Sequence, residues 1–308
     1  MSKLLKREVI LAKIQTDADT PATPVAANDA MLVENVGWSF AGARMTDRPV
    51  VKPTLGQLAR VFGGTLMEVT FDVEIKGSGT AGTAPEVAPL LKACGFDETI
   101  VGATSVTYAP VSTGFEYLTL WFYEDGSLYK LTGAQGNFET NLTTGETGKL
   151  SFTIIGHLGG PTDAALVSPT YASQVPVPFI GATFATGGFA SVINSLTFTP
   201  GNEVVTPPSA NSADGYGTIQ ISDRDYTGSF DPQAELIATD DPIGDWQAGT
   251  AKTIATGAIG ATAGNIYALN ITSATYTEIS PGDRDGIRTH EIGFMSGAGD
   301  TACSLVFT

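Results

Sequence analysis

The sequence predicts a mainly β protein built from two tandem β-sandwich or open-barrel domains. Its 308 residues include 36 glycines and are 42% hydrophobic, a composition that favours strands and turns over long helices. Residues 65–76 alternate between apolar and polar side chains, which is the period of a strand with one wet face. Residues of the first half also recur in the second half at constant spacings. These observations predict a duplicated β domain.

The repeat consists of two sets of matches that occur in the same order in both halves. One set lies 138 positions apart, and the other lies 159 positions apart. The first set pairs Tyr129 with Tyr267, Leu131 with Leu269, Phe138 with Tyr276, Gly148 with Gly286 and Ile154 with Ile292; the second pairs Val33 with Val192, Asn35 with Asn194, Phe71 with Phe230 and Asp72 with Asp231. Such a period is too long for a solenoid and fits two copies of one domain. We expect an arm over 1–30, domains over 31–157 and 178–308, and a linker over 158–177.

The amino-terminal end and the first long connection are expected to be extended. Residues 1–30 contain a Thr- and Pro-rich stretch at 20–24 that cannot bury itself, so the arm is either disordered or docked on a neighbour. A strand-like run over 32–40 opens the first domain, and a connection over 41–64 follows. Loops of that length usually have a function. Within it, the spacing of Leu55, Leu58, Val61 and Phe62 predicts a short helix with an apolar face.

One small helix is predicted in the first domain and none in the second. Val87, Leu90, Leu91 and Cys94 recur at helical spacing, and Gly95 suits the end of a helix. Thr83 and Glu86 have the spacing of a capping box before it. At the corresponding place in the second copy, residues 240–249 show no such stripe, so the duplication is not strict.

The remaining elements are predicted strands. Hairpins are expected over 117–132 and 137–155, around turns at 124–126 and 145–148. The second copy is expected to contain a strand near 191–199, a long polar loop over 200–215, and further strands at 216–221, 226–237, 266–271, 274–279, 287–294 and 305–307.

The chemistry of the chain argues against an enzyme and against a grip on nucleic acid. The net charge of −16 argues against a surface that grips nucleic acid, because such a surface needs clustered Lys and Arg to replace phosphate counterions. An acidic surface suits either a path along which a polyanion slides or simple solubility. With two histidines, two cysteines and no nucleophile motif or phosphate loop, we expect no active site and no cofactor. Asp283-Arg284-Asp285-Gly286 reads either as half a calcium loop or as an ordinary turn.

Two long apolar stretches are not expected to be membrane segments. The uncharged run over 164–202 is broken by Pro169, Pro176 and Pro178, so it does not read as a membrane span. Glu8 and Lys13 interrupt what would be the core of a signal peptide. We therefore expect an intracellular product that has no membrane partner.

Several segments of the first half carry a recognisable pattern. They are Ile10-Leu11-Ala12-Lys13-Ile14, Met31-Leu32-Val33-Glu34-Asn35-Val36, Val69-Thr70-Phe71-Asp72-Val73-Glu74, Gly77-Ser78-Gly79-Thr80-Ala81-Gly82, Pro89-Leu90-Leu91-Lys92-Ala93-Cys94-Gly95-Phe96 and Leu128-Tyr129-Lys130-Leu131-Thr132-Gly133-Ala134. Together they resemble siphophage major tail tube proteins, the proteins that form the tube of non-contractile phage tails. The resemblance covers about residues 8–160, and beyond them it rests on the internal repeat.

The resemblance implies a structural virion protein that assembles with itself. Each domain would hold two packed sheets and a flanking helix, and a chain with two copies looks like the trimeric, pseudo-hexameric variant. Stacked rings would form the tube in the virion tail, with DNA as passing cargo and the tape measure, tip and terminator proteins as further partners. Synthesis would take place in the cytoplasm of the host bacterium.

The resemblance also points to candidate contact residues. The amino-terminal arm and the 41–64 connection would contact the next ring, with the 200–215 loop as the second-copy equivalent. Candidate stacking residues are Leu4, Leu5, Ile10, Leu55, Leu58, Val61 and Phe62. Glu68, Asp72 and Glu74 on the alternating strand are candidates for the lumen face, and an ordinary wetted sheet face explains them equally well.

A second hypothesis is a carbohydrate- or receptor-binding β-sandwich module of a tail tip or adhesin. Such a module would gather exposed aromatic side chains on one face. Trp121, Phe122 and Tyr123 are adjacent and so alternate between faces, and Trp38 and Trp246 show no grouping in the sequence. A monomer in solution would favour this hypothesis over self-assembly.

Overall fold

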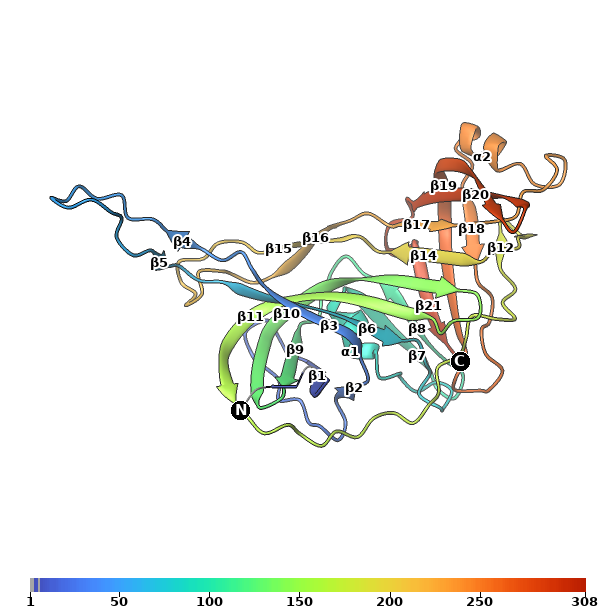
Figure 1. Ribbon diagram of the computed structural model, residues 1–308. Helices are drawn as coiled ribbons and strands as arrows, with labels where there is room; N and C mark the ends of the chain where they lie inside the picture. The colour runs from blue at the N-terminus through green and yellow to red at the C-terminus, as the bar shows by residue number, and fades with distance from the viewer. Residues whose placement is uncertain (1–2, 5) are drawn as a thin grey trace.

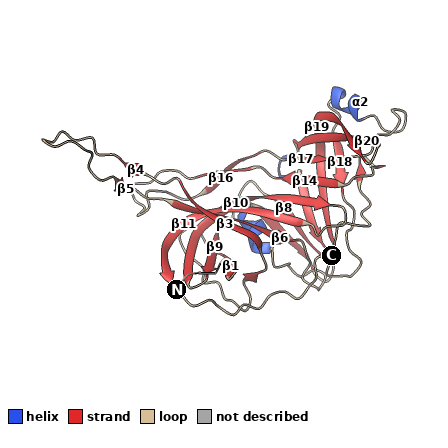
Figure 2. Ribbon diagram, in the orientation of Figure 1, coloured by secondary structure: helices blue, strands red, loops and turns tan. Residues whose placement is uncertain are grey.

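The chain folds as a mainly β protein dominated by one large antiparallel sheet. This computed structural model describes residues 3–4 and 6–308, of which 49% lie in strands, with two α-helices. Every pairing between the strands is antiparallel, and the strands and the two helices are shown in Figures 1 and 2. The predicted β class is therefore confirmed.

The first half of the chain forms a row of seven strands. In space their order is β2-β1-β9-β10-β11-β6-β3. Their bounds are β1 Glu8–Ile14, β2 Ala30–Met31, β3 Glu34–Ala41, β6 Leu66–Glu74, β9 Leu118–Glu124, β10 Ser127–Thr143 and β11 Lys149–Asp163. Helix α1, Ala88–Ala93, lies between β6 and β9 in the chain. The two predicted hairpins are confirmed as β9–β10 and β10–β11.

The second half forms a row of seven strands in the same order. In space they run β13-β12-β18-β19-β20-β17-β14. Their bounds are β12 Ala185–Thr186, β13 Phe189–Ala190, β14 Ser195–Thr199, β17 Thr227–Phe230, β18 Lys252–Ala255, β19 Tyr267–Arg284 and β20 Ile287–Ser296. Helix α2, Pro242–Ala248, lies between β17 and β18. Both halves therefore share one strand order in space and along the chain.

The two rows join edge to edge through β10 and β14. Thr140 pairs with Phe198, Asn141 with Thr197, Leu142 with Leu196 and Thr143 with Ser195. Eight strands, β3-β6-β11-β10-β14-β17-β20-β19, consequently form one continuous sheet. Among the described residues no pairing closes this sheet into a barrel.

A second connection between the halves was not predicted from the sequence. Strands β7, Phe96–Val101, and β8, Ser105–Pro110, form a hairpin, and β8 pairs with the last strand β21, Cys303–Phe307. Strand β21 in turn pairs with the first part of β19. The carboxyl-terminal strand thus ties the first half to the second.

Two long hairpins project from the body on the same side (Figure 1). The first contains β4, Met45–Thr46, and β5, Val61–Phe62, and connects β3 to β6. The second contains β15, Asn202–Val205, and β16, Gln220–Arg224, and connects β14 to β17. The two hairpins therefore occupy corresponding places in the two halves. We call residues 41–64 the first hairpin arm and residues 200–225 the second.

One apolar core runs through both halves and is rich in aromatic side chains. Phe71 stacks on Phe152, with ring centroids 5.8 Å apart, and Phe152 also contacts Phe138. In the second half Phe230 packs on Phe294 and Tyr276, each with centroids 6.0 Å apart. All six of these side chains are buried, and burial of such a side chain contributes about 1.5–3 kcal/mol.

The amino-terminal segment differs from the predicted arm. Residues Glu8–Ile14 form β1, which pairs along its whole length with β9, and Ile10 also pairs with Met31 of β2. Ile10 and Leu11 are buried because this strand completes the first row and covers part of its core. The prediction of an extended arm over 1–30 is therefore wrong for these residues. The expected boundary at 157 also falls inside a strand, since β11 continues to Asp163.

The prediction that only the first half contains a helix is also wrong. Asp241 caps α2 by accepting a hydrogen bond from the Gly244 N–H at 2.8 Å, and Pro242 takes the first helical position. Gly249 ends the helix at φ +63°, a left-handed conformation that glycine adopts without strain. Pro242 is the only buried residue of α2, so this helix does not pack an apolar stripe against the core.

Helix α1 confirms the predicted apolar stripe but not its predicted cap. Leu90, Leu91 and Cys94 are buried, and Gly95 follows the helix at φ +76°. No side chain caps the first turn. The Glu86 carboxylate instead lies 2.9 Å from the buried ammonium group of Lys76. Glu86 therefore forms an ion pair and does not complete the predicted capping box.

Candidate functional site: free sheet edges and a projecting arm

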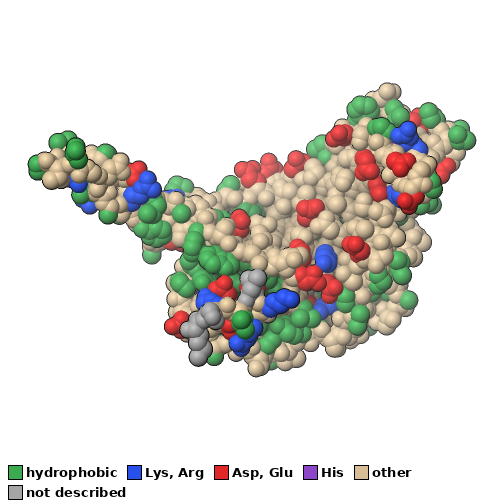
Figure 3. Space-filling model, in the orientation of Figure 1, with side chains coloured by type: hydrophobic (Ala, Val, Ile, Leu, Met, Phe, Trp, Pro, Cys, Tyr) green, Lys and Arg blue, Asp and Glu red, His purple; other side chains and the backbone are tan. Residues whose placement is uncertain are grey.

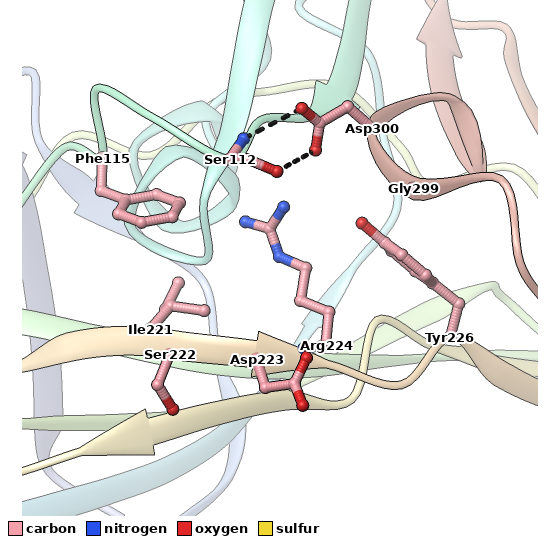
Figure 4. Close-up of a pocket in the computed structure, with 9 residues that line it drawn as sticks. All are labelled: Ser112, Phe115, Ile221, Ser222, Asp223, Arg224, Tyr226, Gly299 and Asp300. Atoms are coloured by element: carbon pink, nitrogen blue, oxygen red, sulfur yellow. Dashed lines mark hydrogen bonds between the residues drawn. The ribbon is translucent and has the colours of Figure 1, made fainter.

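The pocket between the two halves is lined by polar groups that form hydrogen bonds across it. It encloses about 290 Å³ and is shown in Figure 4. Arg224 donates to the carbonyl oxygens of Gly95 and Val111, both at 2.8 Å, and its side chain lies over Phe115. Across the pocket the Asp300 carboxylate accepts hydrogen bonds from Ser112. These polar groups therefore serve to join the first half to the second.

A second groove contains a His–Asp pair that anchors a loop of the second hairpin arm. His157 Nδ1 lies 2.6 Å from Asp214 Oδ2, and Ser212 donates to the other carboxylate oxygen at 2.6 Å. Partial burial opposes ionisation of Asp214, but hydrogen bonds from Ser212, His157 and the Tyr216 N–H outweigh it and lower the pKa of the carboxyl group. The serine contacts the aspartate and not the histidine, so this is not a nucleophile–base pair.

The same loop holds the base of the first hairpin arm. Arg44 donates to the carbonyl oxygen of Gly215 at 2.8 Å, and its guanidinium lies 3.9 Å from the centre of the Tyr216 ring. The Tyr216 hydroxyl donates to the carbonyl oxygen of Gly42. The two hairpin arms are thus fixed to each other near the body.

The acidic turn near residue 285 is a tight hairpin. Asp285 and Gly286, with φ values of +53° and +84°, connect β19 to β20 directly. Asp283 Oδ1 accepts from the Gly286 N–H at 3.4 Å. No group of three metal-ligating side chains occurs among residues 3–4 and 6–308. This geometry favours the turn over the calcium-loop interpretation.

One face of the eight-stranded sheet is mostly polar. Cross-strand neighbours on that face include Thr70 beside Thr153 and Ser229 beside Thr197. The charged members include Glu34, Glu68, Asp72, Glu74, Glu139, Lys149, Glu278, Arg284 and Glu291, and Arg284 is paired with the Asp231 carboxylate at 2.6 Å. Lys149 lies 2.6 Å from Glu34, so its charge is paired. The face therefore combines short hydroxyl side chains with an excess of carboxylates.

The predicted lumen acids lie together on this polar face. Glu68, Asp72 and Glu74 are partly exposed, and Val69, Phe71 and Val73, which alternate with them on β6, are buried, as the alternation predicts. Asp72 accepts a hydrogen bond from the Asn35 side chain at 2.7 Å, and Glu74 accepts one from Thr147 at 3.2 Å. The structure shows a wetted sheet face, and its assignment to a lumen stays a prediction.

Each end of the eight-stranded sheet leaves a strand edge without a partner. In the described part of the chain, β3 pairs only with β6. The second part of β19, residues 275–284, pairs only with β20, because β18 ends its pairing at Ala274. Unpaired N–H and C=O groups along such edges are ready to pair with another strand. Sequence patterning gave no signal for these edges because they depend on which strands meet in space.

Exposed aromatic side chains gather at the β3 edge. The rings of Trp38 and Phe40 lie 5.4 Å apart, and those of Trp38 and Tyr129 lie 5.6 Å apart. Trp38 and Phe40 remain 40% and 52% exposed. Large aromatic groups of this kind are typical of binding surfaces. Figure 3 shows hydrophobic side chains gathered on the part of the body where the first hairpin arm begins, and again at the tip of that arm.

The predicted stacking residues fall into three groups. Leu55, Val61 and Phe62 lie exposed on the first hairpin arm, and Leu58 there is half-buried. Leu4 is also exposed, whereas Ile10 is buried in β1 and is not available to a neighbouring molecule. Leu5 lies outside the residues that the structure describes.

The helix predicted near Leu55 does not form. Residues 47–60 are irregular, and Val61–Phe62 forms strand β5. An apolar helical stripe needs a surface to bury against, and this arm projects away from the body (Figure 1). Val51 and Leu55 are consequently fully exposed at its tip. The arm carries apolar side chains that its own chain does not cover.

The chain matches no protein-family model and no curated protein. None of the helices in the described residues is long and apolar enough to cross a membrane.

Proposed function

We propose that this chain is a structural virion protein that assembles with copies of itself into stacked rings, forming the tail tube of a non-contractile phage. The observation that carries the proposal is the joint between β10 and β14. It links two halves of identical strand order and leaves one free edge at each end of the sheet. The proposal takes the two halves as tandem tail-tube-like domains.

The position of the free edges favours a closed ring. A contact between the β3 edge of one copy and the β19 edge of another is heterologous, and such contacts make rings when the rotation closes. Three copies would bring together six halves and about 24 strands in one barrel, which is wider than the 16–18-stranded porins that already hold an aqueous channel. This is the trimeric, pseudo-hexameric ring that the resemblance to tail tube proteins implies.

The polar sheet face supplies a suitable lining for such a channel. Glu68, Asp72 and Glu74 contribute carboxylates, and the Lys149 charge is paired with Glu34. Phosphate binding depends on free Lys and Arg side chains that release counterions, and Lys149 and Arg284 on this face are both paired with carboxylates. DNA would therefore pass as cargo without being held, and the chain needs no cofactor and no catalytic group.

The first hairpin arm supports contacts between successive rings. Its exposed Leu55, Val61 and Phe62 need apolar partners that a single chain does not provide. Leu4 adds an exposed apolar side chain at the amino-terminal end. The tape measure, tip and terminator proteins belong to the proposal through the resemblance alone, as does the location in the virion tail.

Electron microscopy of the purified protein tests this function. The protein is examined by negative staining over a concentration series, with light scattering after size-exclusion chromatography. We expect rings of about three chains and hollow tubes, which need added tail-tip components if nucleation is slow. A protein that stays a dispersed monomer at every concentration, even with those components present, contradicts the proposal.

The aromatic cluster at the β3 edge favours one alternative, a carbohydrate-binding module. Trp38 and Phe40, beside the partly buried Tyr129, form a group of surface aromatics of the kind that such a module requires. A glycan array separates the two functions when wild type is compared with Trp38→Ala. Saturable glycan binding that the substitution abolishes, by a protein that remains monomeric, supports the module and contradicts self-assembly.

A further inference from the structure

We propose that β3 of one copy pairs antiparallel with residues 278–284 of β19 of the next copy, in the register that β14 and β10 use within one chain. In this register Ser39 of one copy faces Ser280 of its neighbour. The inference rests on the proposed self-assembly and adds to it the two surfaces that meet and their alignment.

The first step is the correspondence between β3 and β14. Each is the outermost strand of its row, next to β6 or β17. Asp231 accepts hydrogen bonds from the N–H groups of Asn194 and Ser195, and Asp72 accepts one from the side chain of Asn35. The sequence repeats Phe71-Asp72 as Phe230-Asp231, which places Thr70 at the position of Ser229. Thr70 pairs with Gly37 and Ser229 pairs with Thr197, so Gly37 corresponds to Thr197.

The second step is the correspondence between β10 and β19. Phe71 pairs with Phe152 of β11, and its counterpart Phe230 pairs with Ile292 of β20. Lys149 lies three residues before Phe152 and pairs with Asn141 of β10. Thr289 lies three residues before Ile292 and pairs with Gly282 of β19. These strand pairings, followed from Phe71 and Phe230, align Ile292 with Phe152, two residues from its sequence match Ile154, and we use the alignment that the pairings give. Gly282 of β19 therefore corresponds to Asn141 of β10.

The in-chain joint then gives the register between copies. Asn141 pairs with Thr197 within one chain. Gly282 is the counterpart of Asn141, and Gly37 is the counterpart of Thr197. The same pairing between copies therefore places Gly282 opposite Gly37 of the next copy. In an antiparallel pair, two steps along both strands place Ser280 opposite Ser39, on the same face of the sheet.

The side chains along this register allow close approach. Gly37, Ser39, Ser280 and Gly282 are all small, so no bulky group on their face obstructs the ladder. Trp38 points to the other face, where the adjoining copy would cover its exposed ring. Pro281 has a carbonyl oxygen but no N–H, so the β19 edge lacks one hydrogen-bond donor. A missing donor makes the edge less able to pair with unrelated strands.

A second in-chain contact extends the template beyond the strands. The root of the second hairpin arm crosses the first half, where the Asn202 side chain donates to the carbonyl oxygens of Cys94 and Gly136. Cys94 follows α1 as Gly249 follows α2. The root of the first hairpin arm would accordingly lie near the end of α2 in the next copy, where Trp246 is 44% exposed. Phe40 at that root would then gain an apolar partner.

Disulfide trapping tests the register in the assembled protein. We expect the double variant Ser39→Cys/Ser280→Cys to oxidise between copies, giving a ladder of dimers and trimers on denaturing gels that reduction abolishes. Each single variant should give no ladder. Asn141→Cys/Thr197→Cys is the matched control, because these residues already pair within the chain and should form an intramolecular bond. The native Cys94 and Cys303 are buried.

The outcomes separate this inference from the proposed function. The double variant can form rings or tubes in the microscope and still give no ladder of disulfide-linked copies. If the Asn141→Cys/Thr197→Cys control oxidises under the same conditions, this result overturns the register and leaves self-assembly intact. A protein that never assembles contradicts the proposed function itself. Hydrogen exchange of the unmodified protein gives a second reading that needs no substitution. We expect assembly to protect the amides of 35–41 and 278–284, and unchanged exchange at both segments in assembled protein overturns the inference.

Discussion

Lys149 and Glu34 form an ion pair that spans the strand lying between their own. Lys149 is the first residue of β11 and Glu34 the first of β3, and their charged atoms lie 2.6 Å apart over the polar face of β6. The hydrogen bond to Glu34 is the main reason why the pKa of Lys149 is raised. The pair neutralises a cation on the sheet face that we propose as the channel lining.

We expect Lys149→Gln to change the charge of this face with little effect on the fold. Both side chains remain about one third to one half exposed, and ion pairs in that environment contribute roughly 0–1 kcal/mol. Urea unfolding should therefore show a loss of at most about 1 kcal/mol. The matched control is Glu34→Gln, which removes the same pair and frees the lysine. A loss of several kcal/mol in either variant would contradict the assignment of this pair to a solvated surface.

The cap of α2 gives a sharper test of local structure. Asp241→Ala removes the side chain that accepts from the Gly244 N–H and should lower the free energy of unfolding by about 1 kcal/mol. Asp241→Asn keeps a capping oxygen and should cost much less. Thermal or urea unfolding measures both variants. Equal losses in the two would mean that the charge of Asp241, and not its capping hydrogen bond, matters.

Helix α2 also illustrates what the sequence could and could not predict. The sequence contains its capping signals, Asp241, Pro242 and Gly249, but no apolar stripe, which an exposed helix does not need. The strand β6 was predictable because one of its faces is buried and the other wet. The sequence predicts two strands at 266–271 and 274–279, whereas the structure has one strand, β19, that continues through Ser273 at φ +49°.

The candidate site was predictable only where it depends on local pattern. The alternation of β6 placed Glu68, Asp72 and Glu74 on one face, and the structure keeps them there. The free edges could not be predicted, because the β10–β14 joint brings together residues that are far apart in the chain. Ile10 was assigned to an arm because its strand partner, β9, lies more than a hundred residues away.

We expect acid to loosen the loop that holds the first hairpin arm. The pKa of Asp214 is lowered in the folded protein, so the carboxylate stabilises the fold above the ordinary pKa of the group. That contribution is lost as the pH falls through the lowered folded value. Asp214→Asn should therefore weaken the loop at neutral pH and flatten its dependence on pH in the acidic range. Hydrogen exchange over residues 209–216 measures both effects.

The matched control for this loop is Asp223→Asn, because Asp223 lies on the second hairpin arm away from His157. Its only described side-chain hydrogen bond is to its neighbour Arg224. An acid response that Asp223→Asn reduces as strongly as Asp214→Asn would show that general charge, and not the His157–Asp214 contact, controls the loop.

Shortening the first hairpin arm should separate ring formation from stacking. Replacing residues 45–62 by a short Gly-Ser turn removes exposed Val51, Leu55 and Phe62 but keeps β3, β6 and both free edges. If the arm joins successive rings, the variant should form rings that do not elongate, because lateral pairing does not use the removed residues. Electron microscopy distinguishes rings from tubes directly. The control substitutes Leu55→Ser/Val51→Ser within a full-length arm and should reduce tube length without abolishing rings. Tubes of normal length from the shortened chain would show that stacking depends on other surfaces and would remove the arm from the proposed mechanism.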